Sequence, residues 1–128
     1  MIEAKEDKGG LLAAYEASME TPCVAEKLSG TTPEQFMERL SGMRVLSFYD
    51  GETPIGAAVF HDNFGHIGIR REYHGRWANR GVLREISRMW GESPEAMVDH
   101  RNDKAMSFTF KLGLTPRYLE GNMVRFQQ

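Results

Sequence analysis

Apolar side chains recur along this chain with two periods, one typical of helices and one typical of strands. From residue 11 to residue 28 they fall near helical spacing, with a break at Thr21-Pro22. Farther along, turn sequences separate short runs rich in β-forming residues, at 44–49, 55–61 and 66–69. The pattern predicts a helical N-terminal part followed by three strands in an antiparallel meander. Residues 1–9 are expected to add a short edge strand or to fray.

The sequence also predicts where a further helix begins, at residues 32–35. Thr32 can cap the first turn, Pro33 suits the first helical position, and Gln35 completes a capping box. Phe36, Met37 and Leu40 then lie on one side. The helix is therefore expected to end near Gly42, just before the first strand of the meander.

The second half of the chain returns to a helical period after the meander. Its apolar positions recur at i, i+3, i+4 and i+7 and predict a helix over 79–90 that ends at Gly91. Residues 96–100 form a short candidate strand. Asn102 can cap another helix that stops at Gly113, although Phe108 and Phe110 suit a strand equally well. Residues 117–126 close the chain as strand material.

Composition limits the possible functions only modestly. The chain has 128 residues, 41% of them hydrophobic and 27% charged, as expected for a single soluble globular domain over residues 1–128. A net charge of −2 gives no general attraction to nucleic acid or to an anionic membrane. Cys23 is the only cysteine, which excludes an internal disulfide and favours a reducing compartment. The acidic N-terminus lacks a signal peptide, so a cytoplasmic protein is expected.

The segment from residue 67 to residue 83 carries the clearest functional signal. An apolar run breaks into a glycine-containing turn, an amphipathic segment follows, and four arginines crowd the window: Arg70, Arg71, Arg76 and Arg80. Unpaired N–H groups in the first turn of a helix, together with the helix dipole, bind anions, and arginine is well suited to phosphate. The window therefore predicts a phosphate site or, equally, an ordinary strand-to-helix connection with a solvated basic face.

Two motifs, one at residues 67–76 and one at residues 102–114, and the order of the elements resemble the GNAT superfamily of acyl-CoA N-acyltransferases over nearly the whole chain. Residues 67–76, Ile-Gly-Ile-Arg-Arg-Glu-Tyr-His-Gly-Arg, look like the family's fourth strand running into its pyrophosphate loop. Asn102-Asp-Lys-Ala105 followed by Lys111-Leu-Gly113-Leu114 looks like its second motif. The resemblance implies an α/β (α+β) fold, in which helices flank a mixed, mainly antiparallel twisted sheet that splays between the fourth and fifth strands.

The same resemblance implies acetyl-CoA as the acyl donor and an amine as the acceptor. The pantetheine arm of the donor would pair beside the end of the fourth strand, and the pyrophosphate would meet the N–H groups of the following loop. The implied donor-binding residues are Ile69, Arg71, Gly75, Arg76, Trp77, Ala78, Asn79, Arg80 and Asn102.

The chain departs from the family pattern in this loop and in the second-motif helix. The usual loop reads Gln/Arg-x-x-Gly-x-Gly/Ala, but Trp77 and Asn79 stand at its two glycine positions. The indole ring can point outward or pack into the core, and Asn79 can cap the next helix. Many family members carry a tyrosine general acid in the second-motif helix, where this chain has Thr109. A threonine hydroxyl is a poor acid.

Two histidines are the candidates to accept the proton of the attacking amine. His61 and His66 lie on or beside the strands of the meander, and imidazole titrates near neutral pH. The pattern favours ordinary positions at the edge or in the core of the sheet for both, with the catalytic role as the alternative. The four histidines show no metal-ligand spacing, so no metal site is expected.

Two functional classes follow from these residues. In the first, the protein transfers an acetyl group from acetyl-CoA to an amine in the cytoplasm of a bacterial host. In the second, the fold has lost its chemistry and serves as a bacteriophage virion protein or as a partner of host proteins, since the resemblance extends to degenerate phage-encoded members. Binding of DNA or RNA is disfavoured because aromatic residues do not alternate with the basic ones.

Overall fold

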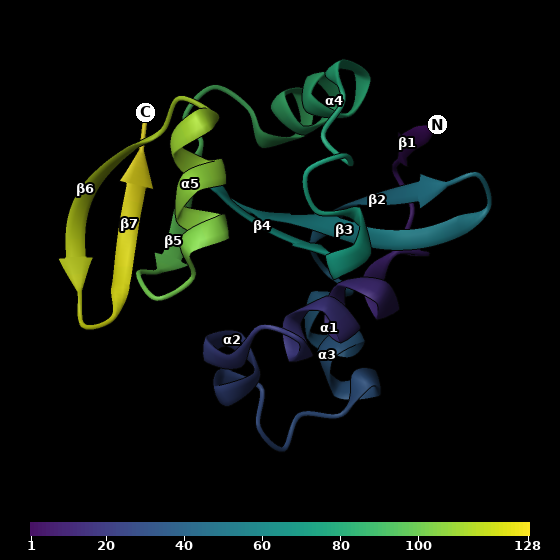
Figure 1. The fold of residues 1–128 in the computed structure, drawn as a ribbon, viewed down its shortest axis with the longest axis horizontal. Coiled ribbons are helices and arrows are strands. Elements are labelled where there is room, and N and C mark those ends of the chain that lie inside the picture. The colour runs from purple at the N-terminus through teal and green to yellow at the C-terminus, as the bar shows by residue number, and fades with distance from the viewer.

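The computed structural model describes all 128 residues and contains one seven-stranded sheet in the order β1-β2-β3-β4-β5-β7-β6 (Figure 1). The strands are β1 (Ile2–Lys5), β2 (Arg44–Asp50), β3 (Thr53–His61), β4 (Phe64–Ile69), β5 (Glu95–Asp99), β6 (Thr115–Glu120) and β7 (Met123–Gln127). The helices are α1 (Leu11–Met19), α2 (Pro22–Lys27), α3 (Pro33–Leu40), α4 (Arg80–Trp90) and α5 (Asp103–Lys111), with a 3-10 turn, η1, at Arg71–Tyr73.

The expected antiparallel meander is confirmed, and the N-terminal segment adds β1 to its edge. The turn between β2 and β3 is shorter than the gap of residues 50–54 between the predicted strands 44–49 and 55–61, because Thr53 pairs with Asp50 and Pro54 pairs with Tyr49. Proline cannot donate to a ladder, and Pro54 lies beside the register shift at Phe48/Tyr49, where its missing N–H is tolerated.

Alternating side chains of the meander build a core on each face of the sheet. The larger core joins Phe48 and Phe60 to the buried side of α4. The smaller one packs Val45 and Val59 against α1, with α3 at its border. Figure 1 accordingly shows α1 and α3 on one side of β2–β4 and α4 on the other. The meander is thus covered on both faces, and its functional groups are confined to its edges and ends.

The sheet divides between β4 and β5. These two strands run parallel and share one register pair, Phe64 with Glu95, whereas β3 and β4 are paired along their whole length. Beyond Phe64 the strands diverge, so the later residues of β4 have no neighbouring strand on that side. This divergence, the splay, confirms the expected architecture.

The predicted helix ends are confirmed as well. The Thr32 hydroxyl and the Gln35 side chain form both bonds of the capping box. The region around Phe108 and Phe110 is helical, because Asn102 caps it and Phe108 packs against the core while Phe110 stays exposed. A strand would have sent these two side chains to the same face, and only one of them has a core to join.

Candidate functional site

The end of β4 presents backbone groups to the splay. Arg70 N–H donates to the Ile55 carbonyl over 2.9 Å, which makes this pair a hydrogen-bonded position of the β3–β4 ladder. Because successive residues of a strand direct their N–H and C=O groups to opposite sides, those of Ile67 and Ile69 point away from β3. The predicted binding residue Ile69 therefore buries its side chain in the core and turns its backbone toward the splay.

The β4–α4 loop, residues 70–79, is an irregular turn rather than a continuation of α4, as predicted. Gly75 adopts φ +85°, and a Cβ added there would meet no atom within 4 Å. The position requires glycine for its backbone conformation, and the open space beside it leaves room for a ligand.

Several amide N–H groups of this loop and of the first turn of α4 have no hydrogen-bond partner in the structure. Those of Arg76 and Asn79 are bonded within the loop, to Tyr73 O over 3.2 Å and to Trp77 O over 3.0 Å. The free amides belong to Gly75, Trp77, Ala78, Arg80 and Gly81. Those of Arg80 and Gly81 belong to the first turn of α4, where the helix dipole places partial positive charge, so this turn can bind an anion without rearranging its own bonds.

Trp77 replaces a family glycine without occupying the ligand side of the loop. Its ring is buried, with ring centroids 5.3 Å from Phe48 and 5.1 Å from Phe108 of α5. The ring thus fills the core between the sheet and α5, and the backbone N–H of Trp77 remains available.

Asn79, at the second family glycine position, caps α4. Its Oδ1 accepts from Val82 N–H over 2.9 Å, and its Nδ2 donates to the Ile2 carbonyl of β1 over 2.9 Å. The side chain therefore fixes the start of α4 against the edge of the sheet. Both departures from the family loop have structural roles that keep the free amides in place.

The three arginines predicted at the cofactor differ in what they contact. Arg71 reaches the C-terminal end of α1, where its Nη2 donates to the Glu20 carbonyl. Arg76 folds back over the ring of Tyr73, 4.6 Å from the ring centroid. Arg80 is exposed and has no ion pair. Of the three, only Arg80 lies at the start of α4, and its guanidinium has no ion pair or hydrogen bond within the protein.

The opposite side of the splay is formed by β5 and α5. Asn102 caps α5 by accepting from Ala105 N–H over 3.2 Å, so the polar end of its side chain serves the helix. Thr109, where the family places its acid, is buried and donates its hydroxyl proton to the Ala105 carbonyl over 2.7 Å. That hydrogen bond engages the only proton the side chain could give.

A buried carboxylate anchors this side of the splay. Asp99, at the end of β5, is bound by the Arg101 guanidinium at 2.8 Å and by Lys27 of α2 at 3.2 Å. The Arg101 side chain, its backbone N–H and Lys27 together hold the pKa of Asp99 well below its usual range. The cluster fastens α2 to the end of β5, which supports the face of the sheet next to the splay.

The two predicted catalytic histidines share a face of the sheet with α1. His66 lies opposite Val59 of the smaller core, and His61 opposite Phe64. Gly68, two residues after His66, would bring an added Cβ against Ala14 of α1, which confirms the face. The side chain of His66 is exposed, yet the protein around it partly desolvates the ring, which, with a smaller contribution from His61, lowers the pKa of His66. A lowered pKa favours the neutral imidazole, which is the form that a general base requires.

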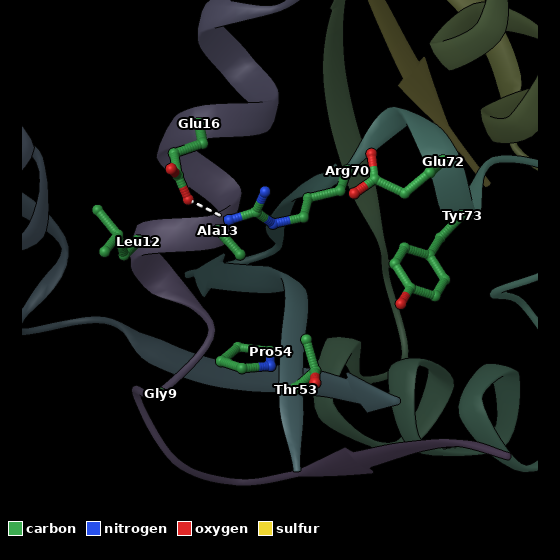
Figure 2. Close-up of a pocket in the computed structure, with 9 residues that line it drawn as sticks. All are labelled: Gly9, Leu12, Ala13, Glu16, Thr53, Pro54, Arg70, Glu72 and Tyr73. Atoms are coloured by element: carbon green, nitrogen blue, oxygen red, sulfur yellow. Dashed lines mark hydrogen bonds and ion pairs between the residues drawn. The ribbon is translucent and has the colours of Figure 1, made fainter. Parts of the chain in front are cut away.

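A separate cavity of about 370 Å³ lies on the other side of the β4–α4 loop, between α1 and the start of β3 (Figure 2). Arg70 reaches across it to an ion pair with Glu16 of α1. Its lining residues are Gly9, Leu12, Ala13, Glu16, Thr53, Pro54, Arg70, Glu72 and Tyr73. None of the predicted donor-binding residues lines this cavity, so it is not the site that the sequence indicated.

Sequence reasoning missed two residues at the mouth of the splay. His74 lies with Nε2 2.8 Å from the Ile69 carbonyl and Nδ1 3.4 Å from Lys104 Nζ of α5. The signal for His74 was present, since it stands at the first position of the family loop. Lys104 has no sequence signal of its own, because its approach to His74 depends on how α5 packs.

Solved structures resemble this chain at low sequence identity and high coverage. A PaiA N-acetyltransferase from Thermoplasma acidophilum, crystallised with coenzyme A, has a TM-score of 0.70 and 13% identity and covers 100% of this chain and 98% of its own. An N-acetyltransferase from Staphylococcus aureus gives a TM-score of 0.72 at 13% identity, with the same coverage. YncA from Salmonella typhimurium, solved with its cofactor acetyl-CoA, gives 0.60 at 13% identity, covering 99% of this chain and 92% of its own.

No family model and no curated protein sequence matches the chain, so the likeness is one of structure. No helix is long and apolar enough to cross a membrane. The strand order, the splay beyond Phe64 and the capped helix after the β4–α4 loop agree with full-length matches to N-acetyltransferases. The chain therefore has the fold of the GNAT acyl-CoA N-acyltransferases.

Proposed function

We propose that this protein is an N-acyltransferase that moves an acetyl group from acetyl-CoA to an amine. The observation that carries the proposal is the row of free amides from Gly75 to Gly81, next to the outward-facing backbone at the end of β4. An anion at this helix start and an amide-bearing arm along β4 are the two features that coenzyme A combines. Neighbours of the same fold were crystallised with coenzyme A and with acetyl-CoA.

The residues of the chain divide the work of binding between two segments. Amides of the β4–α4 loop and the positive end of α4 hold the pyrophosphate, with Arg80 as the nearest uncommitted charge. The backbone groups of Ile67 and Ile69 align the pantetheine arm as a neighbouring strand would. Such positioning converts a bimolecular encounter into a local one and is the main catalytic contribution expected of the fold.

Acetyl-CoA supplies an activated thioester carbonyl to this site. The amine nitrogen forms a bond to that carbon, a β4 amide stabilises the resulting oxyanion, and the carbon–sulfur bond breaks as the amide product forms. His66 takes the proton that the amine nitrogen loses, either directly or through water. The sulfur leaves as a thiolate and takes a proton from solvent.

The absence of a tyrosine at position 109 is compatible with this chemistry. A free thiol of the cysteine type has a pKa of about 8.5, so its thiolate departs near neutral pH without a strong acid beside it. Binding of acetyl-CoA is thus more critical for the rate than protonation of the leaving thiolate. This explains how Thr109 can be engaged with the Ala105 carbonyl in an active enzyme.

The test is release of free thiol from acetyl-CoA in the presence of a panel of amines, polyamines and peptides with free α-amino or lysine groups. We expect amine-dependent thiol release that saturates with acetyl-CoA, together with a product heavier by one acetyl group. If acetyl-CoA binds and no amine is acylated, the fold is a binding module without transfer. If it does not bind, the interaction-protein interpretation takes the place of this one.

A further inference from the structure

Between β4 and the first turn of α5, one side chain fills a hydrogen-bonding position that the sheet leaves open. The Ile69 carbonyl points away from β3, and β5 has already diverged at this level. His74 Nε2 lies 2.8 Å from that oxygen. A carbonyl only accepts, so Nε2 carries the proton of the imidazole and donates it.

The second nitrogen of the same ring faces α5. With the proton on Nε2, Nδ1 is an acceptor, and Lys104 Nζ lies 3.4 Å from it. Lys104 lies in the first turn of α5, where the helix dipole disfavours a cation, and a neutral imidazole acceptor partly offsets that cost. The contact spans the splay, because His74 follows β4 and Lys104 follows β5.

We infer that His74, held by Lys104, is a built-in competitor that occupies the Ile69 carbonyl and must be displaced before the pantetheine arm of an acyl donor can pair with β4. This inference rests on the proposed function, since it assumes that the donor lies along the outward edge of β4. The side chain is exposed and precedes Gly75, whose φ of +85° ends the turn. Displacement therefore disturbs no core packing.

His74 competes with only one half of the donor, the pantetheine half. No hydrogen bond joins the side chain of His74 to the free amides of the loop or to Arg80, so the nucleotide half of coenzyme A meets no competitor. The pantetheine half must replace the hydrogen bond to Ile69. The hydrogen bond from His74 to Ile69 therefore lowers the affinity for the pantetheine half of the donor, and a substitution of His74 should remove this effect.

The test is calorimetric titration of the wild type, His74→Ala and Lys104→Ala with two probes, pantetheine phosphate and the nucleotide half of coenzyme A. His74→Ala should bind the pantetheine probe about three- to tenfold more tightly, the effect of freeing one hydrogen-bonded site, and leave the nucleotide probe unchanged. Lys104→Ala should act in the same direction and more weakly. His100→Ala is the matched control, since its exposed imidazole has no hydrogen bond.

Unchanged or weaker pantetheine binding by His74→Ala would overturn the inference while leaving the proposed function intact. Failure of both probes to bind any variant would overturn both. A readout without ligand checks the contact itself: imidazole nitrogen shifts should show the Nε2–H tautomer of His74 in the free wild type. Rapid exchange between tautomers, unaltered by Lys104→Ala, would contradict the contact.

Discussion

On the β4 side of the splay, backbone groups face outward, loop amides are free and a positive-φ glycine turns the chain toward α4. On the β5 side, every polar group described has a partner within the protein. Asp99 is bound by Arg101 and Lys27, and Thr109 is bonded to Ala105. One side is arranged to receive a ligand, and the other is arranged to hold the structure together.

The difference separates binding from proton transfer. Donor binding in this fold depends on backbone geometry, which tolerates a change of side chain wherever the new side chain finds a place elsewhere. Trp77 does so by entering the core, and Asn79 by capping α4. An acid, in contrast, depends on one side chain, and a threonine at position 109 cannot replace a phenol.

The largest expected effect is on the β4 side. Gly75→Val should lower acetyl-CoA affinity at least about a hundredfold, because valine disfavours φ +85° and its side chain would enter the open space. Arg80→Ala should cost only about 1–2 kcal/mol of binding free energy, and Arg76→Ala should cost less, because the Arg76 side chain is already held over the ring of Tyr73. Calorimetry measures the affinities, and thermal melting should show a cooperative transition in every variant.

Gly121→Val is the matched control, since Gly121 has φ +62° and equally open space in the distant β6–β7 turn. It should carry a similar backbone strain and leave affinity unchanged. Equal, small effects at Gly75, Arg76 and Arg80 would show that the loop is merely a connection between β4 and α4.

The next effect concerns stability rather than binding. Trp77→Ala should lower the free energy of unfolding by about 3–5 kcal/mol, because the buried ring joins Phe48 to Phe108 across the core. Denaturant unfolding followed by circular dichroism measures the change. A loss below about 1 kcal/mol would contradict the assignment of this ring to the core.

An intermediate effect is expected at the proposed base. His66→Ala should slow acyl transfer about a hundredfold. Because the pKa of His66 lies below its ordinary value of 6.5, the imidazole stays neutral above that pH, and the wild-type rate should fall only as pH drops below it. Thiol release measured from pH 5 to 8 tests both points. A hundredfold loss in His61→Ala with none in His66→Ala would move the role to His61.

The smallest effect is expected on the β5 side. Thr109→Val should leave acyl transfer within a few-fold of the wild type, since the hydroxyl proton is already donated to the Ala105 carbonyl. Initial rates at saturating acetyl-CoA measure it. A loss of two orders of magnitude would mean that this hydroxyl is the acid after all and that the two sides are not so different.

The fold could be predicted from the sequence because its signals are local. The apolar period acts within a few residues, and so do the helix caps. These caps lie where they were expected, at Thr32, Asn79 and Asn102. The turn between β2 and β3 was predicted too long because proline is rare inside strands, whereas Pro54 pairs with Tyr49 at a bulge. That tolerance is a property of the neighbouring strand and is not visible in the sequence.

The site could be predicted only in part. The sequence located the loop and Gly75, since glycine and helix starts have local signatures. It did not reveal that Arg71 binds the end of α1, because this contact with Glu20 depends on packing, nor that Arg76 turns back over the ring of Tyr73 in the same loop. The His74–Lys104 contact was missed for the same reason, as it joins two segments that meet only across the splay.

The most direct measurement is calorimetric titration of the wild-type chain with acetyl-CoA. The free amides of the β4–α4 loop and the open edge of β4 predict saturable binding at one site with a micromolar dissociation constant. Acetyl-CoA should also raise the melting temperature of the wild type and raise that of Gly75→Val much less at the same concentration. No heat at millimolar acetyl-CoA would contradict the account, because it would show that the loop amides and the edge of β4 do not bind the donor.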